Sequence, residues 1–139
     1  MKNIFITVSP WSNLIGRILL ALIFILSGYD KIGGYATTQE YMSAFGVPGA
    51  LLPLVIAVEL GGGILIVLGL LTRYVALALA GFSLLAGFMF HSDGSDPMQQ
   101  IMLLKNIAIA GGFLILVANG AGKMSLDRRL GWLSVEETQ

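Results

Sequence analysis

The stretch "LIGRILLALIFILSGYDKIGG", residues 14–34, decides the fold class of this chain. Hydrocarbon side chains fill most of it, interrupted early by Gly16 and Arg17, and Asp30 and Lys31 stand side by side near its end. About 20 apolar residues let an α-helix cross the hydrocarbon core of a bilayer. We therefore predict a membrane-spanning helix over residues 14–33.

The composition also places the chain in a membrane. Hydrophobic residues make up 56% of its 139 residues and charged residues 12%, with a mean hydropathy of +0.85. An average soluble domain carries about 25% charged residues, so the charges here are too few to cover a soluble surface. A net charge of zero argues against a nucleic-acid partner. The absence of cysteine excludes disulfides, thiol catalysis, iron–sulfur clusters and Cys-ligated zinc.

Three further apolar segments are long enough to span, at residues 50–71, 74–91 and 98–119. The first span has a single lysine in front of it and no small-residue cleavage motif behind it, so we expect it to be retained rather than removed as a signal peptide. We find no internal repeat, linker or second domain. The sequence predicts an all-α, four-helix transmembrane bundle as a single domain over residues 1–139.

The connection between the first two predicted spans carries the signals of a short helix. Thr37 and Glu40 have the spacing of a capping box, and a Gly-Val-Pro run from Gly46 ends the segment. The residues from Tyr41 to Phe45 supply an apolar face between these signals. We expect a short interfacial helix here, lying on the outer membrane surface over the bundle.

The segment after the fourth predicted span favours a cytoplasmic amphipathic helix over Ser125–Leu133. Ser125 can cap this helix, and Asp127 stands in its first turn. The apolar stripe consists of Leu126, Leu130 and Leu133, and Trp132 suits the headgroup level.

The distribution of positive charge predicts the orientation. An even number of spans puts both termini on one side of the membrane. Six of the eight lysines and arginines then share that side: Lys2, Arg17, Arg73, Lys123, Arg128 and Arg129. Only Lys31 and Lys105 belong to the other side. Because lysine and arginine accumulate on the cytoplasmic side, we expect both termini in the cytoplasm.

Polar and ionisable residues gather in the outer half of the predicted bundle: Ser27, Lys31, Glu59, His91, Lys105 and Asn106. An ionised side chain in hydrocarbon costs a few kcal/mol or more, so such residues turn inward and pair. Glu59 and Lys105 have opposite charges at similar depth and are our first choice for a pair, with Lys31 as the competing partner. We predict that the six residues line a ligand-binding pocket. Glu59 and Lys105 are the candidates for a catalytic role.

A structural role for the same residues stays open. Asp30 and Lys31 can act as interfacial anchors whose stems reach toward the headgroups. A Glu59–Lys105 pair can fix helix register without binding anything. His91 is typical of a polar residue at the interface.

Glycines predict where the helices approach each other. Gly28, Gly33 and Gly34 would let the first span contact its neighbours, and the run from Gly61 to Gly63 would do the same for the second.

The chain offers little to hold a redox cofactor. Its single histidine, His91, lies in a polar turn rather than in a deep apolar face suited to haem. The three glycines from Gly61 follow a helix rather than a strand, unlike a dinucleotide-binding loop. We therefore expect no intrinsic cofactor and no metal site. A quinone or small phenolic substrate is compatible with the residues, since Glu59 can accept a proton and Lys105 or His91 can hydrogen-bond an oxygen.

Several short motifs, in their order and spacing, resemble the DoxX family of small four-span bacterial membrane proteins. They are Ser27-Gly28-x-x-Lys31, Gly46-Val47-Pro48, Glu59-x-x-Gly62, Leu68-Gly69-x-x-Thr72-Arg73, Lys105 and Gly120-x-Gly122-x-x-Ser125-Leu126-Asp127, covering roughly residues 14–129. The resemblance implies a bacterial inner-membrane helical bundle associated with quinone-linked redox work, since relatives occur as subunits in sulfur-compound oxidation and redox-defence complexes. It also implies kinship with eukaryotic cargo receptors, which are not enzymes, and it supplies no agreed set of catalytic residues.

Three functions are compatible with these observations, and whether the chain is itself an enzyme stays open. The leading hypothesis is a redox-associated subunit that binds a quinone or small aromatic compound in the outer-half pocket and receives electrons from a partner protein. The first alternative is a non-catalytic scaffold that anchors soluble oxidoreductases through Ser125–Leu133. The second is a small-solute transporter or channel, which with four spans and no repeat would require a homo-oligomer.

The orientation is directly testable with reporter fusions. Because positive charge is concentrated with the termini, a reporter fused after Gln139 should report the cytoplasm, and one inserted near Gly94 should report the periplasm. The reverse pattern would remove the predicted outer cluster.

Overall fold

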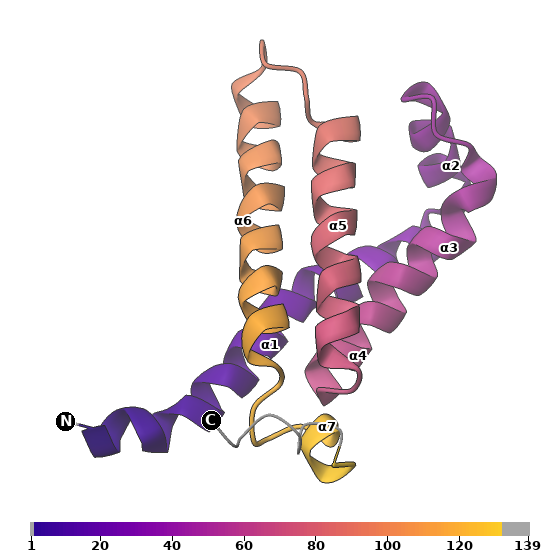
Figure 1. Cartoon of the computed structure of the whole chain (residues 1–139). Helices are drawn as coiled ribbons and strands as arrows, with labels where there is room; N and C mark the ends of the chain where they lie inside the picture. Colours follow the sequence, from indigo (N-terminus) through magenta and orange to yellow (C-terminus); the bar gives the residue numbers. More distant parts are fainter. Residues whose placement is uncertain (1, 132–139) are drawn as a thin grey trace.

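The computed structural model describes residues 2–131, and all secondary structure in this range is helical (Figure 1). The elements are α1 (Lys2–Gly33), α2 (Tyr35–Ala44), the 3₁₀ turn η1 (Gly49–Leu51), α3 (Leu52–Ile56), the π turn η2 (Ala57–Gly61), α4 (Gly62–Leu68), α5 (Thr72–Phe90), α6 (Pro97–Asn119) and α7 (Leu126–Arg129). Four stretches are long and apolar enough to cross a membrane, namely Asn3–Gly33, Gly49–Leu68, Thr72–Phe90 and Pro97–Asn119. The predicted fold class is confirmed.

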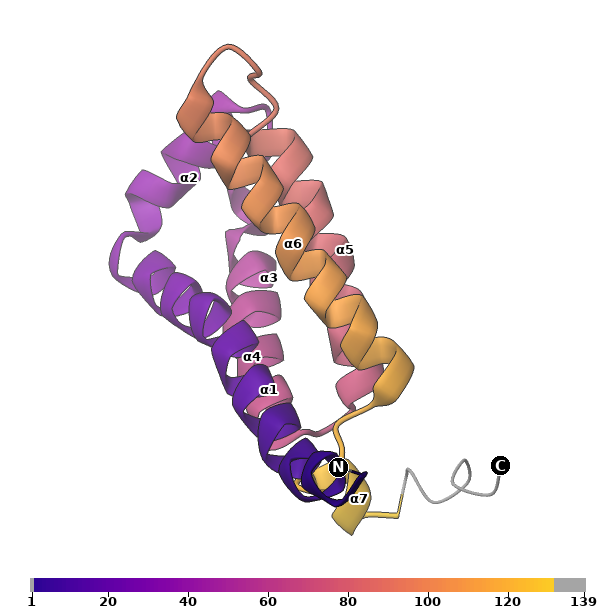
Figure 2. The ribbon, with the colours of Figure 1, turned by 90° about the vertical axis from the view of Figure 1, so that its left-hand side faces the viewer.

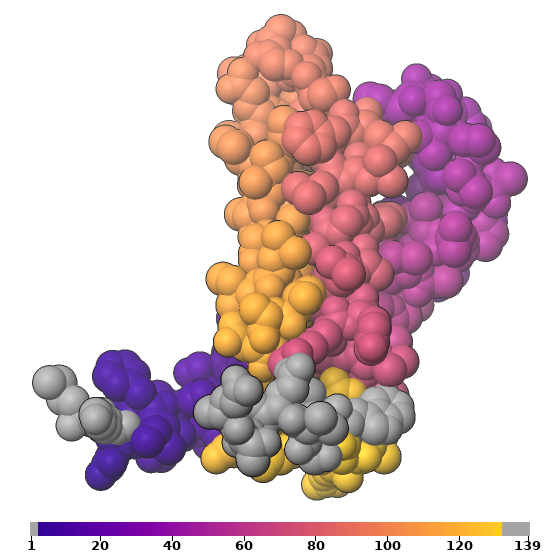
Figure 3. Space-filling model, in the orientation of Figure 1, coloured from indigo at the N-terminus to yellow at the C-terminus, as the bar shows by residue number. Residues whose placement is uncertain are grey.

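The first helix is longer than predicted. It begins at Lys2 and runs through Pro10, although a proline inside a helix removes a backbone donor and crowds the carbonyl four residues before it. Ile4, Phe5 and Ile6 are each about two-thirds exposed. Figure 3 shows this part of α1 as an arm that projects from the bundle. The predicted start at residue 14 was wrong because it followed the apolar run and ignored the helix in front of it.

The second span ends earlier than predicted, at Leu68 rather than at residue 71. Gly69 has φ +67° and caps α4 in the left-handed conformation, which glycine adopts without strain. Leu71 also has a positive φ, and α5 begins directly after it at Thr72. The α4–α5 connection is therefore a tight hairpin, as the sequence suggested, but it is displaced toward the N-terminus.

The four spans form two pairs that separate toward one end. α5 and α6 run side by side, and α1 packs along η2 and α4 (Figures 1 and 2). The pairs meet near α7 and the α4–α5 hairpin, which we call the α7 end. They diverge toward α2 and the α5–α6 loop, which we call the α2 end. The buried core, including Phe24, Ile66, Leu79 and Phe113, holds the pairs together below the divergence.

Glycines allow the close contact between α1 and the second span. A Cβ on Gly28 would lie 2.9 Å from the backbone nitrogen of Leu60, and one on Gly63 would lie 2.7 Å from Cγ1 of Ile25. The predicted packing role is confirmed at these two positions. It was wrong at Gly33 and Gly61, where a Cβ would meet nothing within 4 Å.

The short helix after the first span is confirmed, but not its predicted cap. α2 begins at Tyr35, directly after Gly34 ends α1, so Thr37 already lies inside the helix and cannot cap it. The N-cap residue, Gly34, has no side chain, and Thr38 Oγ1 instead donates a hydrogen bond back to the Gly34 carbonyl at 2.8 Å.

A buried arginine closes the α7 end. From the sequence, Arg17 counted only as one of the cytoplasmic positive charges, yet it is 1% exposed. Its Nη1 donates to the carbonyls of Ile66 (3.1 Å) and Val67 (3.0 Å), which lie at the C-terminal end of α4. Its Nη2 donates to the carbonyl of Met124, and its Nε to Oδ1 of Asn13 at 2.9 Å. One side chain thus joins α1, α4 and the segment that leads into α7.

The C-terminal segment docks on the same hairpin. Asp127 is 4% exposed, and its carboxylate accepts hydrogen bonds from the backbone N–H groups of Leu71 (2.7 Å) and Thr72 (2.9 Å) at the start of α5. Ser125 accepts from the Arg128 N–H at 3.3 Å, so its predicted capping role is confirmed. The remainder of the predicted amphipathic helix, with Trp132 and Leu133, lies outside the described residues.

The buried network predicts a stability effect at Arg17. Arg17→Met would remove one donor from each of three carbonyls, of which that of Ile66 still accepts from the Gly69 N–H. A buried acceptor left without any partner costs about 1–3 kcal/mol. The variant should unfold at a clearly lower temperature in detergent. Lys123→Met removes an exposed positive charge at the same end and is the matched control. Equal melting temperatures for the two variants would show that Arg17 does not hold this end together.

Candidate functional site

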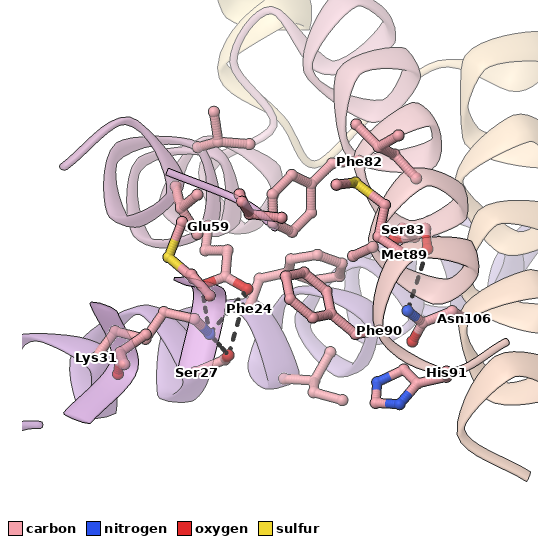
Figure 4. Close-up of a pocket in the computed structure, with 18 of the residues that line it drawn as sticks. Phe24, Ser27, Lys31, Glu59, Phe82, Ser83, Met89, Phe90, His91 and Asn106 are labelled. Carbon is pink, nitrogen blue, oxygen red and sulfur yellow. Dashed lines mark hydrogen bonds and ion pairs between the residues drawn. The ribbon is translucent and has the colours of Figure 1, made fainter. Parts of the chain in front are cut away.

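A cavity of about 470 Å³ lies at the α2 end between the two helix pairs (Figure 4). All six residues predicted to line a pocket lie around it: Ser27, Lys31, Glu59, His91, Lys105 and Asn106. The volume falls in the range of about 300–1,000 Å³ that is typical of small-molecule sites. The structure therefore brings together, from four different spans, the residues that the sequence placed at one depth.

Lys31 and Glu59 form an ion pair on one wall of the cavity. Lys31 Nζ lies 2.9 Å from Glu59 Oε2 and 3.3 Å from Oε1. The predicted first choice, a Glu59–Lys105 pair, is therefore wrong, and the competing partner Lys31 holds the carboxylate. The reason is local: α1 and the second span approach closely at Gly28, so a side chain on that face of α1 reaches Glu59 first.

Ser27 completes this cluster from one helical turn before Lys31. Its Oγ accepts a hydrogen bond from Lys31 Nζ at 2.6 Å and donates one to Glu59 Oε1 at 3.3 Å. Figure 4 shows the three side chains converging. The Glu59 side chain is 8% exposed and that of Lys31 24%. Glu59 Oε2 is buried, and the ion pair with Lys31 is its only polar contact among the described residues.

Glu59 lies in the π turn η2, which the sequence analysis missed. Single π turns inside α-helices shift the register of the side chains and are frequent at functional sites. Here the turn covers Ala57–Gly61 and presents Glu59 at the contact with α1. The available signal was the glycine run that begins inside it, since glycine lowers the cost of departing from regular α-helix.

Lys105 lines the cavity without an acidic partner. Its Nζ contacts only the thioether of Met102, at 3.5 Å, and within residues 2–131 no carboxylate lies at ion-pair distance from it. The neighbouring Asn106 donates from Nδ2 to the backbone carbonyl of Ser83 at 3.1 Å, which ties α6 to α5. His91 follows the end of α5, and its Nδ1 lies 2.7 Å from Oε1 of Gln99.

Aromatic rings form much of the remaining wall, and the sequence analysis did not identify them as site residues. Phe24 and Phe82 meet edge to face with their ring centroids 6.5 Å apart. Tyr41 of α2 stacks on Phe90 of α5, with 5.4 Å between centroids and 22° between ring planes. This stacking, together with Met42, makes α2 a roof over the cavity, as predicted.

The cavity opens sideways between α3 and α5. Leu54 and Leu85 both line it, and each is 61% exposed. The space-filling view shows the corresponding separation between α5 and the α2–α3 segment (Figure 3). In a bilayer, exposed leucines on spanning helices face lipid. The opening therefore leads into the hydrocarbon region of the membrane.

Comparisons with known proteins agree with this architecture. The DoxX family model matches residues 12–92. "Inner membrane protein YqjF" of Escherichia coli is 52% identical over 84% of this chain and 90% of its own length, and "Inner membrane protein YphA" of the same organism is 40% identical over 86% and 91%. "Putative oxidoreductase CatD" of Bacillus subtilis is 30% identical over 70% and 76%. No solved structure matches the chain. The chain is an integral inner-membrane protein and belongs to the DoxX family.

Proposed function

We propose that this protein is a redox-associated membrane subunit that binds a quinone or a small aromatic compound in the cavity at the α2 end. One observation carries the proposal: aromatic walls and an ion pair meet in a single cavity that is also lined by the exposed leucines Leu54 and Leu85. Ligand pockets are typically apolar with a few convergent polar groups, and this cavity has that composition.

The shape of the cavity suits a ring with a lipid-soluble substituent. A flat head group can lie against Phe24, Phe82 and Phe90, because aromatic pairs favour stacked and edge-to-face contacts. An alkyl tail can leave through the opening between Leu54 and Leu85. Such a ligand reaches the site from the bilayer and does not have to cross the polar roof.

The polar groups suit a ligand that exchanges protons. Glu59 can pass a proton to a ring oxygen when electrons from a partner protein reduce the quinone, and Lys31 can compensate the charge of the carboxylate that remains. Asn106 and His91 offer further hydrogen bonds to ring oxygens. Electrons come from a partner protein in this proposal, since the chain needs no cofactor of its own. The name of CatD supports a redox setting for the family.

The scaffold alternative has less support from the fold. Two polar groups of the C-terminal segment are used inside the molecule, since Asp127 caps α5 and Ser125 caps α7, and this leaves Arg128 and Arg129 as its exposed charges. A transporter or channel in an oligomer stays the second alternative.

As part of the proposal we place both termini in the cytoplasm, so that the cavity lies in the periplasmic half of the membrane. The reporter fusions at Gln139 and near Gly94 test that placement.

Binding of a decyl-substituted benzoquinone to the protein in nanodiscs tests the proposal. Equilibrium dialysis against the quinone should give saturable binding beyond that of empty nanodiscs. Ala86 lines the cavity, so Ala86→Trp should fill it and lower the affinity by about tenfold or more. Ala78→Trp adds the same ring to an exposed position of α5 and should leave binding unchanged.

The controls separate the hypotheses. A melting temperature near that of the unmodified protein shows that Ala86→Trp is folded. If the unmodified protein binds no more quinone than empty nanodiscs do, the proposal fails. Co-purification of a soluble oxidoreductase in that case would favour the scaffold.

A further inference from the structure

The charges that face the cavity do not cancel. The titratable side chains on its wall, apart from Tyr41, are Lys31, Glu59, His91 and Lys105. Glu59 is the only carboxylate among them, and Lys31 already neutralises it at 2.9 Å. Among the described residues, the one polar contact of Lys105 Nζ is with the thioether of Met102. Protonation of His91 would add to this positive charge and would not cancel it.

The position of Lys105 along α6 makes its positive charge energetically unfavourable unless the charge is paired. It is eight residues from the start of α6 at Pro97, which corresponds to about 12 Å along the helix axis. A lysine inside hydrocarbon costs a few kcal/mol or more unless it pairs or reaches the interface. Asp30, the nearest acidic residue along α1 to the Lys31 cluster, is exposed and does not line the cavity. Within residues 2–131, no acidic side chain forms an ion pair with Lys105.

We infer that the ligand is an acidic aromatic compound that binds as its anion, with its charged oxygen at Lys105 Nζ. Hydroxyquinones, acidic phenols and aromatic carboxylic acids belong to this class. The inference rests on the proposed function and narrows it. The anionic ligand supplies the negative charge that is missing beside Lys105. Charge-assisted hydrogen bonds are roughly twice as strong as neutral ones.

The arrangement also explains the separate roles of the two lysines. Lys31 is held by Ser27 and Glu59 and has no charge to offer a second anion. Lys105 is on the facing helix pair, beside Asn106, which donates one of its two amide N–H groups to the Ser83 carbonyl. An anion placed at Lys105 thus lies across the cavity from the carboxylate of Glu59, and this limits their repulsion.

Two naphthoquinones of matched shape provide the test. 2-Hydroxy-1,4-naphthoquinone is an anion at neutral pH, whereas 2-methoxy-1,4-naphthoquinone has the same ring system without a charge. Binding of each to the full chain in nanodiscs of zwitterionic lipid is measured by calorimetry, with empty nanodiscs subtracted. The unmodified protein should bind the hydroxy compound about tenfold more tightly or better. The preference should fall as the pH is lowered through the pKa of the ligand.

Variants of Lys105 assign the preference to that side chain. Lys105→Met should lower the affinity for the hydroxy compound at least about tenfold more than the affinity for the methoxy compound. Lys105→Arg should restore the preference, because it returns the charge. Lys123→Met, at the α7 end, should leave the preference unchanged.

The possible failures are distinguishable. Equal affinity of the unmodified protein for the two compounds overturns the inference and leaves the proposed function standing. A preference that survives in Lys105→Met also overturns it, since the charge would then act from elsewhere. If neither compound binds, the proposed function fails together with the inference.

Discussion

The ion pair between Lys31 and Glu59 is the interaction on which the site depends. A carboxylate in a lipid-embedded bundle needs a partner, and the close approach of α1 to the second span at Gly28 makes Lys31 that partner. The pair connects α1 to the π turn, and it occupies the one carboxylate that residues 2–131 place on the cavity wall. Lys105 is left without an acid as a direct consequence. The organisation of charge in the cavity thus follows from one 2.9 Å contact.

The two ends of the bundle solve the problem of buried charge in opposite ways. At the α7 end, Arg17 and Asp127 form hydrogen bonds with backbone groups of the α4–α5 hairpin and the C-terminal segment. That end is closed by these hydrogen bonds. At the α2 end, the helix pairs diverge and the cavity retains an unpaired lysine and an opening into lipid. A rigid closed end that supports an open, incompletely satisfied end is the arrangement expected of a binding protein.

The sequence predicted what depends on composition and periodicity. The spans follow from apolar length, and the six polar residues of the cavity follow from the rule that ionisable groups in a membrane turn inward. It ranked Lys31 behind Lys105 as the partner of Glu59, because depth along a helix says nothing about direction around it, and the π turn changes that direction. Arg17 was missed because, among residues 2–131, three of the four hydrogen bonds that it donates go to backbone carbonyls, which no sequence motif marks. The false capping box at Thr37 arose because α2 starts immediately after Gly34.

A double-mutant cycle on the ion pair tests this account most directly. Breaking a buried pair costs about 3–5 kcal/mol, because one charge is left without its partner. Glu59→Gln and Lys31→Met should each lower the free energy of unfolding in detergent, and the two together should cost clearly less than the sum. Glu59→Gln with Lys105→Met should be additive. Additive losses for Glu59 with Lys31, and coupling of Glu59 with Lys105, would contradict the account.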